Sequence, residues 1–348
     1  MLIYVGAYTP AGRGGIGCFR QDPVSGALGE VHPPVLATDP SYLAWSHPQH
    51  GRPGEVLYAV SESAGDVLAF ARTPDGHLSS LSVEWTGGTD PCHLTVDPSG
   101  RFLVTANYGD GTVSVHPIDP DGSLGPRRDL LTFRGYGPHP ERQTGPHAHM
   151  IAYRPGGGSF FVTDLGTDTL HEYALSPDGS VRPIGTTALA AGSGPRHLAF
   201  HPTEPVAYVS GELNSTVIVC KVLPEGLRPT GSLPSTMEEF GGVNYPSHIA
   251  VSDDGRFVYI ANRGADRITA YAVDGDGLRP LADTPTGGKW PRHFAIIGDF
   301  LYVANQDSAT VTALRIDPET GGLGEATVAA RFPNPTCILA EPSSTGTA

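Results

Sequence analysis

The sequence predicts an all-β fold, a seven-bladed β-propeller in which each blade is a four-stranded antiparallel sheet. The first observation is a unit of strand-like segments that recurs every 44 to 55 residues along the 348-residue chain. The second is the composition: 45 glycines and 33 prolines separate short apolar runs, which is typical of short strands joined by tight turns. The third is that the two ends of the chain complete one unit between them.

Each unit begins with a short strand of mainly apolar residues that follows a proline. Its copies are "PSYLAW" at 40, "PCHLTV" at 91, "PHAHMIAY" at 146, "PRHLAF" at 195, "PSHIAV" at 246, "PRHFAI" at 291 and "PTCILA" at 335. The second strands of the first six units are "EVLYAVSE", "RFLVTANY", "SFFVTDLG", "PVAYVSGE", "RFVYIANR" and "DFLYVANQ". Apolar runs of this length between turn residues indicate buried strands.

A third strand and a glycine turn complete the pattern. The third strands are "DVLAF", "TVSVH", "TLHEY", "TVIVC", "RITAY" and "TVTAL". They lead into turns such as "TPDG", "DPDG" and "SPDG", which supply the glycine that hairpins require. A weaker fourth strand follows each turn.

The seventh unit is divided between the two ends of the chain. Its first strand is C-terminal, whereas its second strand, "LIYVGAY", and its third, "GIGCF", are N-terminal. Pairing of the N-terminal strands with the C-terminal strand would close the ring and leave no open sheet edge. We therefore predict one propeller domain over residues 1–348, with blade seven split between residues 1–35 and 335–342.

Composition and charge narrow the possible partners and location. The formal net charge of −14 argues against a nucleic-acid partner, which favours a basic surface. No apolar run approaches the roughly 20 residues of a membrane helix, and "MLIYVGAYTP" lacks the features of a signal peptide. We expect a cytoplasmic protein with no membrane partner, and the sequence carries no signal for an oligomeric state. The four cysteines form no CxxC and are expected to be buried free thiols.

A residue that recurs in most blades is explained by the fold, whereas a residue found in one or two blades is a functional candidate. Histidines recur near the start of the first strand, at His93, His149, His197, His248 and His293, and blade one has Tyr42 there. Hydrogen bonds to neighbouring blades explain such a series. The residue between the proline and the histidine instead varies, and it is arginine only at Arg196 and Arg292.

The residue that closes the second strand varies too. The series is Glu62, Tyr108, Leu165, Glu212, Arg263 and Gln306, and turn-forming residues such as Asn107 precede it. Antiparallel strands bring the start of the first strand and the end of the second to one face. We therefore expect the rare charged residues and one histidine to converge at the mouth of the central channel. These residues are Arg196, Arg263, Arg292, Glu212 and His149.

A long connection enters blade three on the same face. The segment "RGYGPHPERQTG", residues 134–145, adds Arg142 and leads to His147 and His149. Long loops inside compact repeats are often functional. We include Arg142 and His147 in the candidate site.

These residue types suit an anion pocket with acid–base groups. Guanidinium groups hold carboxylates or phosphates, and a histidine, or a glutamate whose pKa burial raises, can move a proton. Positive neighbours would stabilise an oxyanion on an ester carbonyl. The sequence has no GxSxG and no HExxH, so we expect neither a serine nucleophile nor a metal or other cofactor.

The motifs "GPRHLAFHP", "SGELNSTV", "ERQTGPHAHM" and "DPCHLTVDPSGRFLVTANYGDGTV" closely resemble the seven-bladed propeller lactonases. That family includes propeller-type 6-phosphogluconolactonases and the fungal 3-carboxy-cis,cis-muconate lactonizing enzymes, and the likeness covers essentially the whole chain. It implies a metal-free site with His149, Glu212 and Arg196 as catalytic residues and Arg263 as a binding residue. Our reading of the repeat adds Arg292, Arg142, His147, His197 and Asn107 as substrate-binding residues.

The resemblance favours hydrolysis of an anionic sugar lactone, most similar to 6-phosphogluconolactone. The arginines would then clamp the anion, and His149 or Glu212 would activate water. A cycloisomerase of the carboxymuconate type, or a pathway-specific cyclase, is the alternative reaction. The alternative of another class is a non-catalytic propeller that binds a small molecule or a protein.

Overall fold

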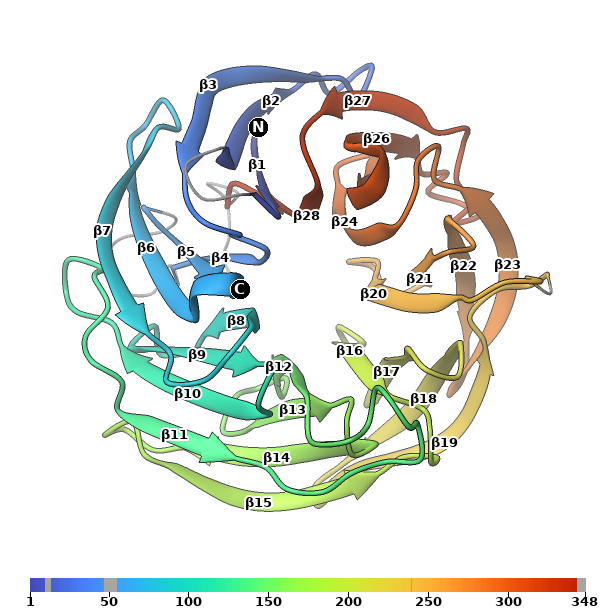
Figure 1. Cartoon of the computed structure of the whole chain (residues 1–348). Coiled ribbons are helices and arrows are strands. Elements are labelled where there is room, and N and C mark those ends of the chain that lie inside the picture. Colours follow the sequence, from blue (N-terminus) through green and yellow to red (C-terminus); the bar gives the residue numbers. More distant parts are fainter. Residues whose placement is uncertain (10–13, 47–54, 239, 343–348) are drawn as a thin grey trace.

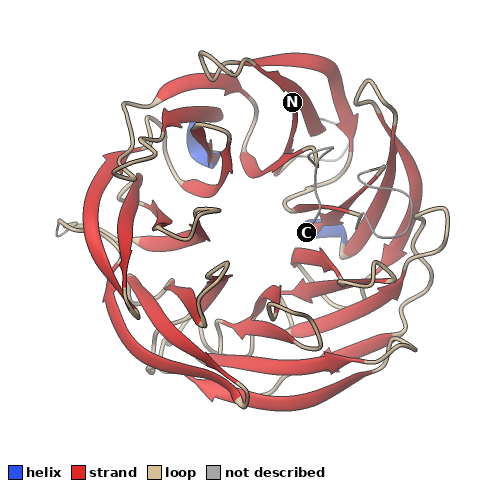
Figure 2. Ribbon diagram, turned by 180° about the vertical axis from the view of Figure 1, so that it is seen from behind, coloured by secondary structure: helices blue, strands red, loops and turns tan. Residues whose placement is uncertain are grey.

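The structure, a computed structural model, is a ring of seven sheets around a central channel (Figure 1). It describes residues 1–9, 14–46, 55–238 and 240–342. Every sheet has four strands, and neighbouring strands are antiparallel. The helices of the described residues are the single 3-10 turns η2 (Glu62–Ala64) and η3 (Gln306–Ser308), seen from the other side in Figure 2. The predicted all-β, seven-bladed propeller is confirmed.

The strands of each blade follow one another in the chain from hub to rim. Blade one comprises β4 (Leu43–Trp45), β5 (Val56–Ser61), β6 (Asp66–Arg72) and β7 (Leu78–Trp85). Blade two comprises β8 (Pro91–Val96), β9 (Phe102–Asn107), β10 (Thr112–Pro117) and β11 (Asp129–Thr132). Blade three comprises β12 (Ala148–Tyr153), β13 (Phe160–Asp164), β14 (Thr169–Leu175) and β15 (Val181–Ala188). Blade four comprises β16 (Pro195–Phe200), β17 (Val206–Gly211), β18 (Thr216–Leu223) and β19 (Gly226–Pro234). Blade five comprises β20 (Tyr245–Val251), β21 (Phe257–Arg263), β22 (Arg267–Asp274) and β23 (Gly277–Pro285). Blade six comprises β24 (Pro291–Ile297), β25 (Phe300–Asn305), β26 (Thr310–Arg315) and β27 (Thr327–Arg331).

Blade seven closes the ring with both ends of the chain. It comprises β28 (Pro335–Ala340), β1 (Leu2–Ala7), β2 (Gly15–Gln21) and β3 (Leu28–Leu36). Ile3 pairs with Ala340 and Val5 with Ile338. This pairing confirms the predicted closure, and it leaves no inner strand of the ring without a neighbour.

The second strand of a blade lies inside the sheet and between two neighbouring blades, so its side chains are covered on both faces. Every residue of β5, β9 and β17 is buried, whereas most residues of the rim strand β7 are exposed. The apolar clusters lie between blades: Phe102 and Val104 of blade two pack with Phe160 and Val162 of blade three. All four cysteines are buried free thiols, as predicted.

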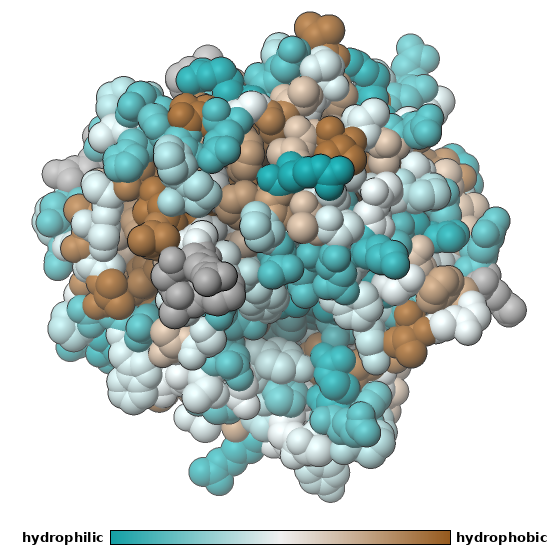
Figure 3. Space-filling model, turned by 45° about the horizontal axis from the view of Figure 1, so that its top comes forward, coloured by the Kyte–Doolittle hydropathy of each residue, from teal (hydrophilic) through white to brown (hydrophobic). Residues whose placement is uncertain are grey.

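Figure 3 shows hydrophilic side chains over much of one face, with hydrophobic ones gathered in separate patches. No helix of the described residues has the length and hydropathy needed to cross a bilayer.

The seven first strands place one residue each at the hub in the same register. His93 pairs with Ala106, and His293 pairs with Ala304. In blade three the equivalent residue, which pairs with Thr163, is Met150. The hub residues are therefore Tyr42, His93, Met150, His197, His248, His293 and Cys337.

The placement of His149 in the series of hub histidines is thus wrong. Hub residues accept a backbone N–H from the next blade: His93 Nδ1 from Ile151 at 3.4 Å, and His293 Nδ1 from Ile338 at 3.3 Å. In blade three it is the Met150 sulfur that accepts such a bond, from Leu198 at 3.1 Å. In the segment "PHAHM" the hub residue is the fourth after the proline rather than the second, and it is Met150, so matching the histidine misaligns this blade by one residue.

The hub histidines form a tightly packed buried cluster. His197 Nδ1 and His248 Nδ1 are 2.9 Å apart, and the rings of His248 and His293 stack at 4.0 Å. Burial, assisted by the positive charge of Arg196, lowers the pKa of His93 and of His293 to about 3. The imidazoles of the folded hub are therefore neutral at pH 7.

This cluster predicts an unusual loss of stability at mildly acidic pH. Below pH 6.5 the unfolded chain protonates these histidines while the folded hub does not, so each one lowers the free energy of unfolding by about 1.4 kcal/mol per pH unit. We expect His293→Met, which copies the methionine of blade three, to reduce the slope between pH 6.5 and 5 by about that amount. Denaturant unfolding across this pH range measures it.

The matched control is His77→Gln, because His77 is exposed on a surface turn. This variant should keep the native dependence of unfolding free energy on pH. A native protein whose stability is constant from pH 6.5 to 5 would contradict the neutral buried cluster.

Candidate active site

Two series of residues meet at one end of the channel. The first series consists of the residue immediately before the hub residue in the first strand of each blade. The second consists of the residue that closes the second strand of each blade. In blade four the strands β16 and β17 are antiparallel, so Arg196 from the first series and Glu212 from the second lie at the same end. Arg196 Nε is 3.1 Å from Glu212 Oε2, as the predicted convergence requires.

A cavity of about 210 Å³ opens between these residues. Its lining consists of Tyr8, Glu62, Cys92, Tyr108, Arg142, His149, Glu212, Arg263 and Arg292. Eight of the nine belong to the two series and come from all seven blades, and Arg142 comes from the loop before blade three. The repeat therefore brings residues that are distant in sequence into one small site.

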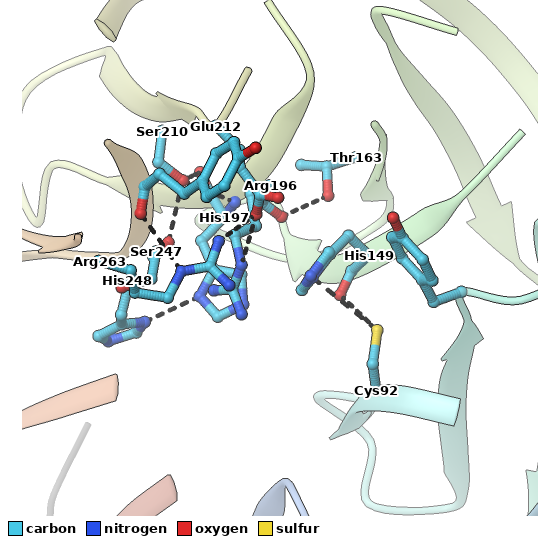
Figure 4. A network of polar contacts seen from close by, with 12 residues as sticks. Cys92, His149, Thr163, Arg196, His197, Ser210, Glu212, Ser247, His248 and Arg263 are labelled. Atoms are coloured by element: carbon cyan, nitrogen blue, oxygen red, sulfur yellow. Dashed lines mark hydrogen bonds and ion pairs between the residues drawn. The ribbon is translucent and has the colours of Figure 1, made fainter. Parts of the chain in front are cut away.

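Glu212 is the most heavily paired group of the site (Figure 4). Its Oε1 accepts from Arg142 Nη2 at 2.6 Å, and its Oε2 accepts from Arg263 Nη2 at 2.5 Å and lies beside Arg196. The residue is 2% exposed. Burial alone would raise the pKa of Glu212, but the three guanidinium groups lower it to about 2. The expectation of a glutamate with a raised pKa is wrong for Glu212.

Arg196 lies behind the cavity wall rather than in it. It is 3% exposed, and burial together with Arg263 and Arg292 lowers its pKa to about 9. Its backbone carbonyl accepts a hydrogen bond from Thr163 at 2.7 Å. Its Nη1 has no hydrogen-bond partner among the described residues, and buried guanidinium nitrogens usually have one.

The loop before blade three is anchored so that Arg142 faces the cavity. The side-chain amide of Gln143 is buried and donates to the Leu165 carbonyl at 2.9 Å and to Asp168 at 2.8 Å. Arg142 Nη2 also donates to the Tyr108 hydroxyl at 3.1 Å. The long loop therefore contributes a defined cation to the site.

His149 occupies a site position rather than a hub position. Counted from the hub residue of its strand, it is equivalent to Arg196, Cys92 and Arg292. Its Nδ1 lies 3.8 Å from Cys92 Sγ (Figure 4), and its ring meets that of Tyr108 edge-on. Burial and then the neighbouring arginines lower the pKa of His149 well below 6.5, so its imidazole is neutral.

Blades seven, one and six contribute a second group of polar residues. The Tyr8 hydroxyl donates to Glu62 Oε1 at 2.7 Å, and the Ser41 hydroxyl donates to Glu62 Oε2. The guanidinium of Arg292 stacks over the Tyr8 ring at 4.9 Å. Burial raises the pKa of Tyr8, so its hydroxyl remains protonated. No ion pair of Glu62 or Arg292 occurs within the described part of the chain.

Tyr8, Glu62, Cys92 and Tyr108 are cavity residues that were not among the predicted site residues. The repeat carried the signal for all four. Glu62 and Tyr108 are equivalent to Glu212, and Tyr8 fills that position in the split blade, where it pairs with Asn334 as Glu212 pairs with Gly194. Cys92 is equivalent to Arg196.

Three predicted substrate-binding residues do not line the cavity. Asn107 is fully buried and donates to Thr112 at 3.0 Å. His147 stacks on Tyr108 at 4.4 Å and contacts its carbonyl, and His197 belongs to the hub. We assign these side chains to positioning the strand ends rather than to substrate contact. Among the described residues no group of three or more His, Cys, Asp and Glu side chains is placed to hold a metal ion.

Known proteins resemble this chain over nearly its whole length. The family model described as "Lactonase, 7-bladed beta-propeller" matches residues 2–340. The 6-phosphogluconolactonase of Bacillus subtilis is 35% identical over 344 residues, which are 96% of this chain and 97% of that protein. The periplasmic gluconolactonase of Pseudomonas aeruginosa has a TM-score of 0.91 at 29% identity, over 98% of this chain and all of that one. A candidate 6-phosphogluconolactonase from Bacteroides fragilis has a TM-score of 0.89 at 32% identity, over 97% of each chain.

The family model spans all seven blades, including the split one, and the cavity lies at the mouth that these blades share. Sequence identity above 30% over almost the full length of the Bacillus protein supports the same assignment. The chain belongs to the seven-bladed β-propeller lactonase family.

Proposed function

We propose that this lactonase hydrolyses an anionic sugar lactone and that its substrate is 6-phosphogluconolactone. The observation that carries the proposal is the charge of the site. Four guanidinium groups face two carboxylates, so the site carries two excess positive charges within a chain of net charge −14. Such a local field attracts and orients an anion against the overall charge of the protein.

The charges divide between two groups at the cavity. Arg142, Arg196 and Arg263 surround Glu212 and leave a net charge of +2; we call these four residues the arginine cluster. Glu62 and Arg292 carry no net charge together, and we call them, with Tyr8 and Ser41, the Glu62 group. A phosphate monoester, close to a dianion at neutral pH, matches the arginine cluster, and planar guanidinium groups suit its oxygens.

Lactone hydrolysis needs an activated water and a stabilised oxyanion. With the phosphate on the arginine cluster, the ester carbonyl lies toward the Glu62 group, where Arg292 offers a guanidinium that no carboxylate of the described residues pairs with. The neutral imidazole of His149 adds a hydrogen-bond donor to the cavity wall. The family name and the relative from Bacillus support this reaction.

The products distinguish the alternatives. Consumption of 6-phosphogluconolactone above the uncatalysed rate supports the proposal, whereas cyclisation of 3-carboxy-cis,cis-muconate with no lactone hydrolysis would assign the site to a cycloisomerase. Inactivity toward both compounds would favour a binding propeller.

The cytoplasmic location stays a prediction.

Arg142→Gln tests the role of the arginine cluster. Arg142 is partly exposed at the loop, so its loss should weaken phosphate binding without unfolding the blades. We expect KM for 6-phosphogluconolactone to rise at least about tenfold, while kcat/KM for glucono-δ-lactone, which lacks the phosphate, changes less than about threefold. Initial rates with both lactones measure the difference.

The control is Arg134→Gln, in the same loop but exposed, which should leave both substrates unaffected. Equal losses for the phosphorylated and the unphosphorylated lactone in Arg142→Gln would contradict a phosphate site at the arginine cluster.

Glu212→Gln tests whether Glu212 holds the cluster together. Removing the shared counter-charge leaves buried guanidinium groups without a carboxylate, and we expect the free energy of unfolding at pH 7 to fall by roughly 3–5 kcal/mol. The same stabilisation is present above pH 4.5 in the native protein and is lost as the pH falls toward 2, because the folded-state pKa is the lower one.

Urea unfolding at pH 7 measures this effect. Glu225→Gln, at an exposed turn, should change the free energy of unfolding by less than about 0.5 kcal/mol. A loss below about 1 kcal/mol in Glu212→Gln would show that the cluster does not need its carboxylate.

A further inference from the structure

The cavity contains two carboxylates at equivalent positions of different blades. Glu62 follows β5 in blade one and Glu212 follows β17 in blade four, and both line the cavity. The backbone N–H of Glu62 donates to the Asp39 carbonyl, and that of Glu212 donates to the Gly194 carbonyl, in the same register. The fold thus offers two glutamates to the substrate, and their surroundings differ.

Glu212 is poorly suited to accept a proton. Three guanidinium groups occupy its two oxygens at 2.5 to 3.1 Å. Protonating it would break these ion pairs and leave buried cations unpaired, which is costly. Its chemistry is that of a counter-ion.

His149 is also poorly suited to act as a base. The residue is 5% exposed, and its ring lies close to Cys92. Protonation would create a further cation beside Arg196, Arg263 and Arg292, and it is disfavoured by their charge. A neutral imidazole in this position serves better as a hydrogen-bond donor or acceptor.

Glu62 has the contacts that a base requires. Its carboxylate accepts one hydrogen bond on each oxygen, from the hydroxyls of Tyr8 and Ser41, and a carboxylate has about four acceptor sites. One site on each oxygen is therefore left for a water molecule. No guanidinium of the described residues lies within ion-pair distance of it.

We infer that Glu62 is the general base that activates the attacking water, and that Tyr8 and Ser41 orient its carboxylate. The inference rests on the proposed lactone hydrolysis and deepens it. The base role then falls to Glu62 and not to His149 or Glu212, the two bases suggested by the sequence.

The step balances as a simple ester hydrolysis. Glu62 takes a proton from water as the water oxygen bonds to the lactone carbonyl carbon, and the carbonyl π electrons move to the oxygen beside Arg292. When this tetrahedral intermediate collapses, the bond from carbon to the ring oxygen breaks. The ring oxygen takes the proton back from Glu62, and the product is the open hydroxy acid, which then ionises.

Glu62→Gln tests the inference, because the amide keeps the shape of the carboxylate but cannot accept the proton. We expect kcat for 6-phosphogluconolactone to fall at least about 100-fold, with KM within about threefold and an unchanged melting temperature. The kcat of Glu62→Ala should fall by a similar factor. This variant should regain activity with added formate, a small carboxylate that can enter the vacated space.

The matched control is Gln306→Ala. Gln306 occupies the same blade position as Glu62 but does not line the cavity, so kcat and KM should remain native. If Glu62→Gln does not fold, Glu62→Asp is the deciding variant, because aspartate keeps the charge but moves the carboxylate away from the substrate. The inference requires the kcat of Glu62→Asp to be at least about tenfold lower than the native value.

Two results separate the inference from the proposed function. A native protein that does not hydrolyse 6-phosphogluconolactone overturns the proposed function, and the inference falls with it. A native protein that hydrolyses this lactone, combined with Glu62→Gln at more than about a third of native kcat, overturns the inference alone. Absence of formate rescue in a folded Glu62→Ala would contradict a base role for the carboxylate as well.

Discussion

The site depends on one constraint, the common register in which seven first strands enter the hub. Because each strand pairs with its neighbour in the same way, the residue before the hub position and the residue after the second strand reach the same end of every blade. Every blade places at least one residue from these positions in the cavity lining. A change at one of them places a new side chain in the shared cavity without altering the ring, so chemistry can vary while the architecture stays constant.

Charge compensation is the second condition for a working site. Arginine side chains that converge on a small cavity repel one another, and burial adds a desolvation cost. Glu212 relieves this by accepting hydrogen bonds from Arg142 and Arg263 and by forming an ion pair with Arg196, but a carboxylate used in this way is a weak base. A site that concentrates positive charge for an anion therefore needs a separate group for proton transfer. Glu62, whose partners are two hydroxyls, is not used to neutralise the arginine cluster and can take that role.

The repeat made the fold predictable, including the split blade, because four strand segments and a glycine turn recur with nearly constant spacing. The convergence of Arg196 and Glu212 followed from strand direction alone. Two features were not accessible in this way. In blade three a histidine stands one residue before the hub position, so His149 was aligned with the hub histidines in place of Met150. Glu62 stands in the same series as Glu212, and only side-chain contacts show that Glu212 has three arginines within ion-pair distance whereas Glu62 has none among the described residues.

The central claim is that the arginine cluster around Glu212 binds the anionic end of the substrate and leaves the carbonyl beside Glu62. A crystal structure with bound 6-phosphogluconate, the product of the proposed reaction, tests this most directly. The account predicts phosphate oxygens within hydrogen-bond distance of Arg142 or Arg263 and the product carboxylate near Arg292. A phosphate bound at Arg292, or a product bound outside the cavity, would contradict it.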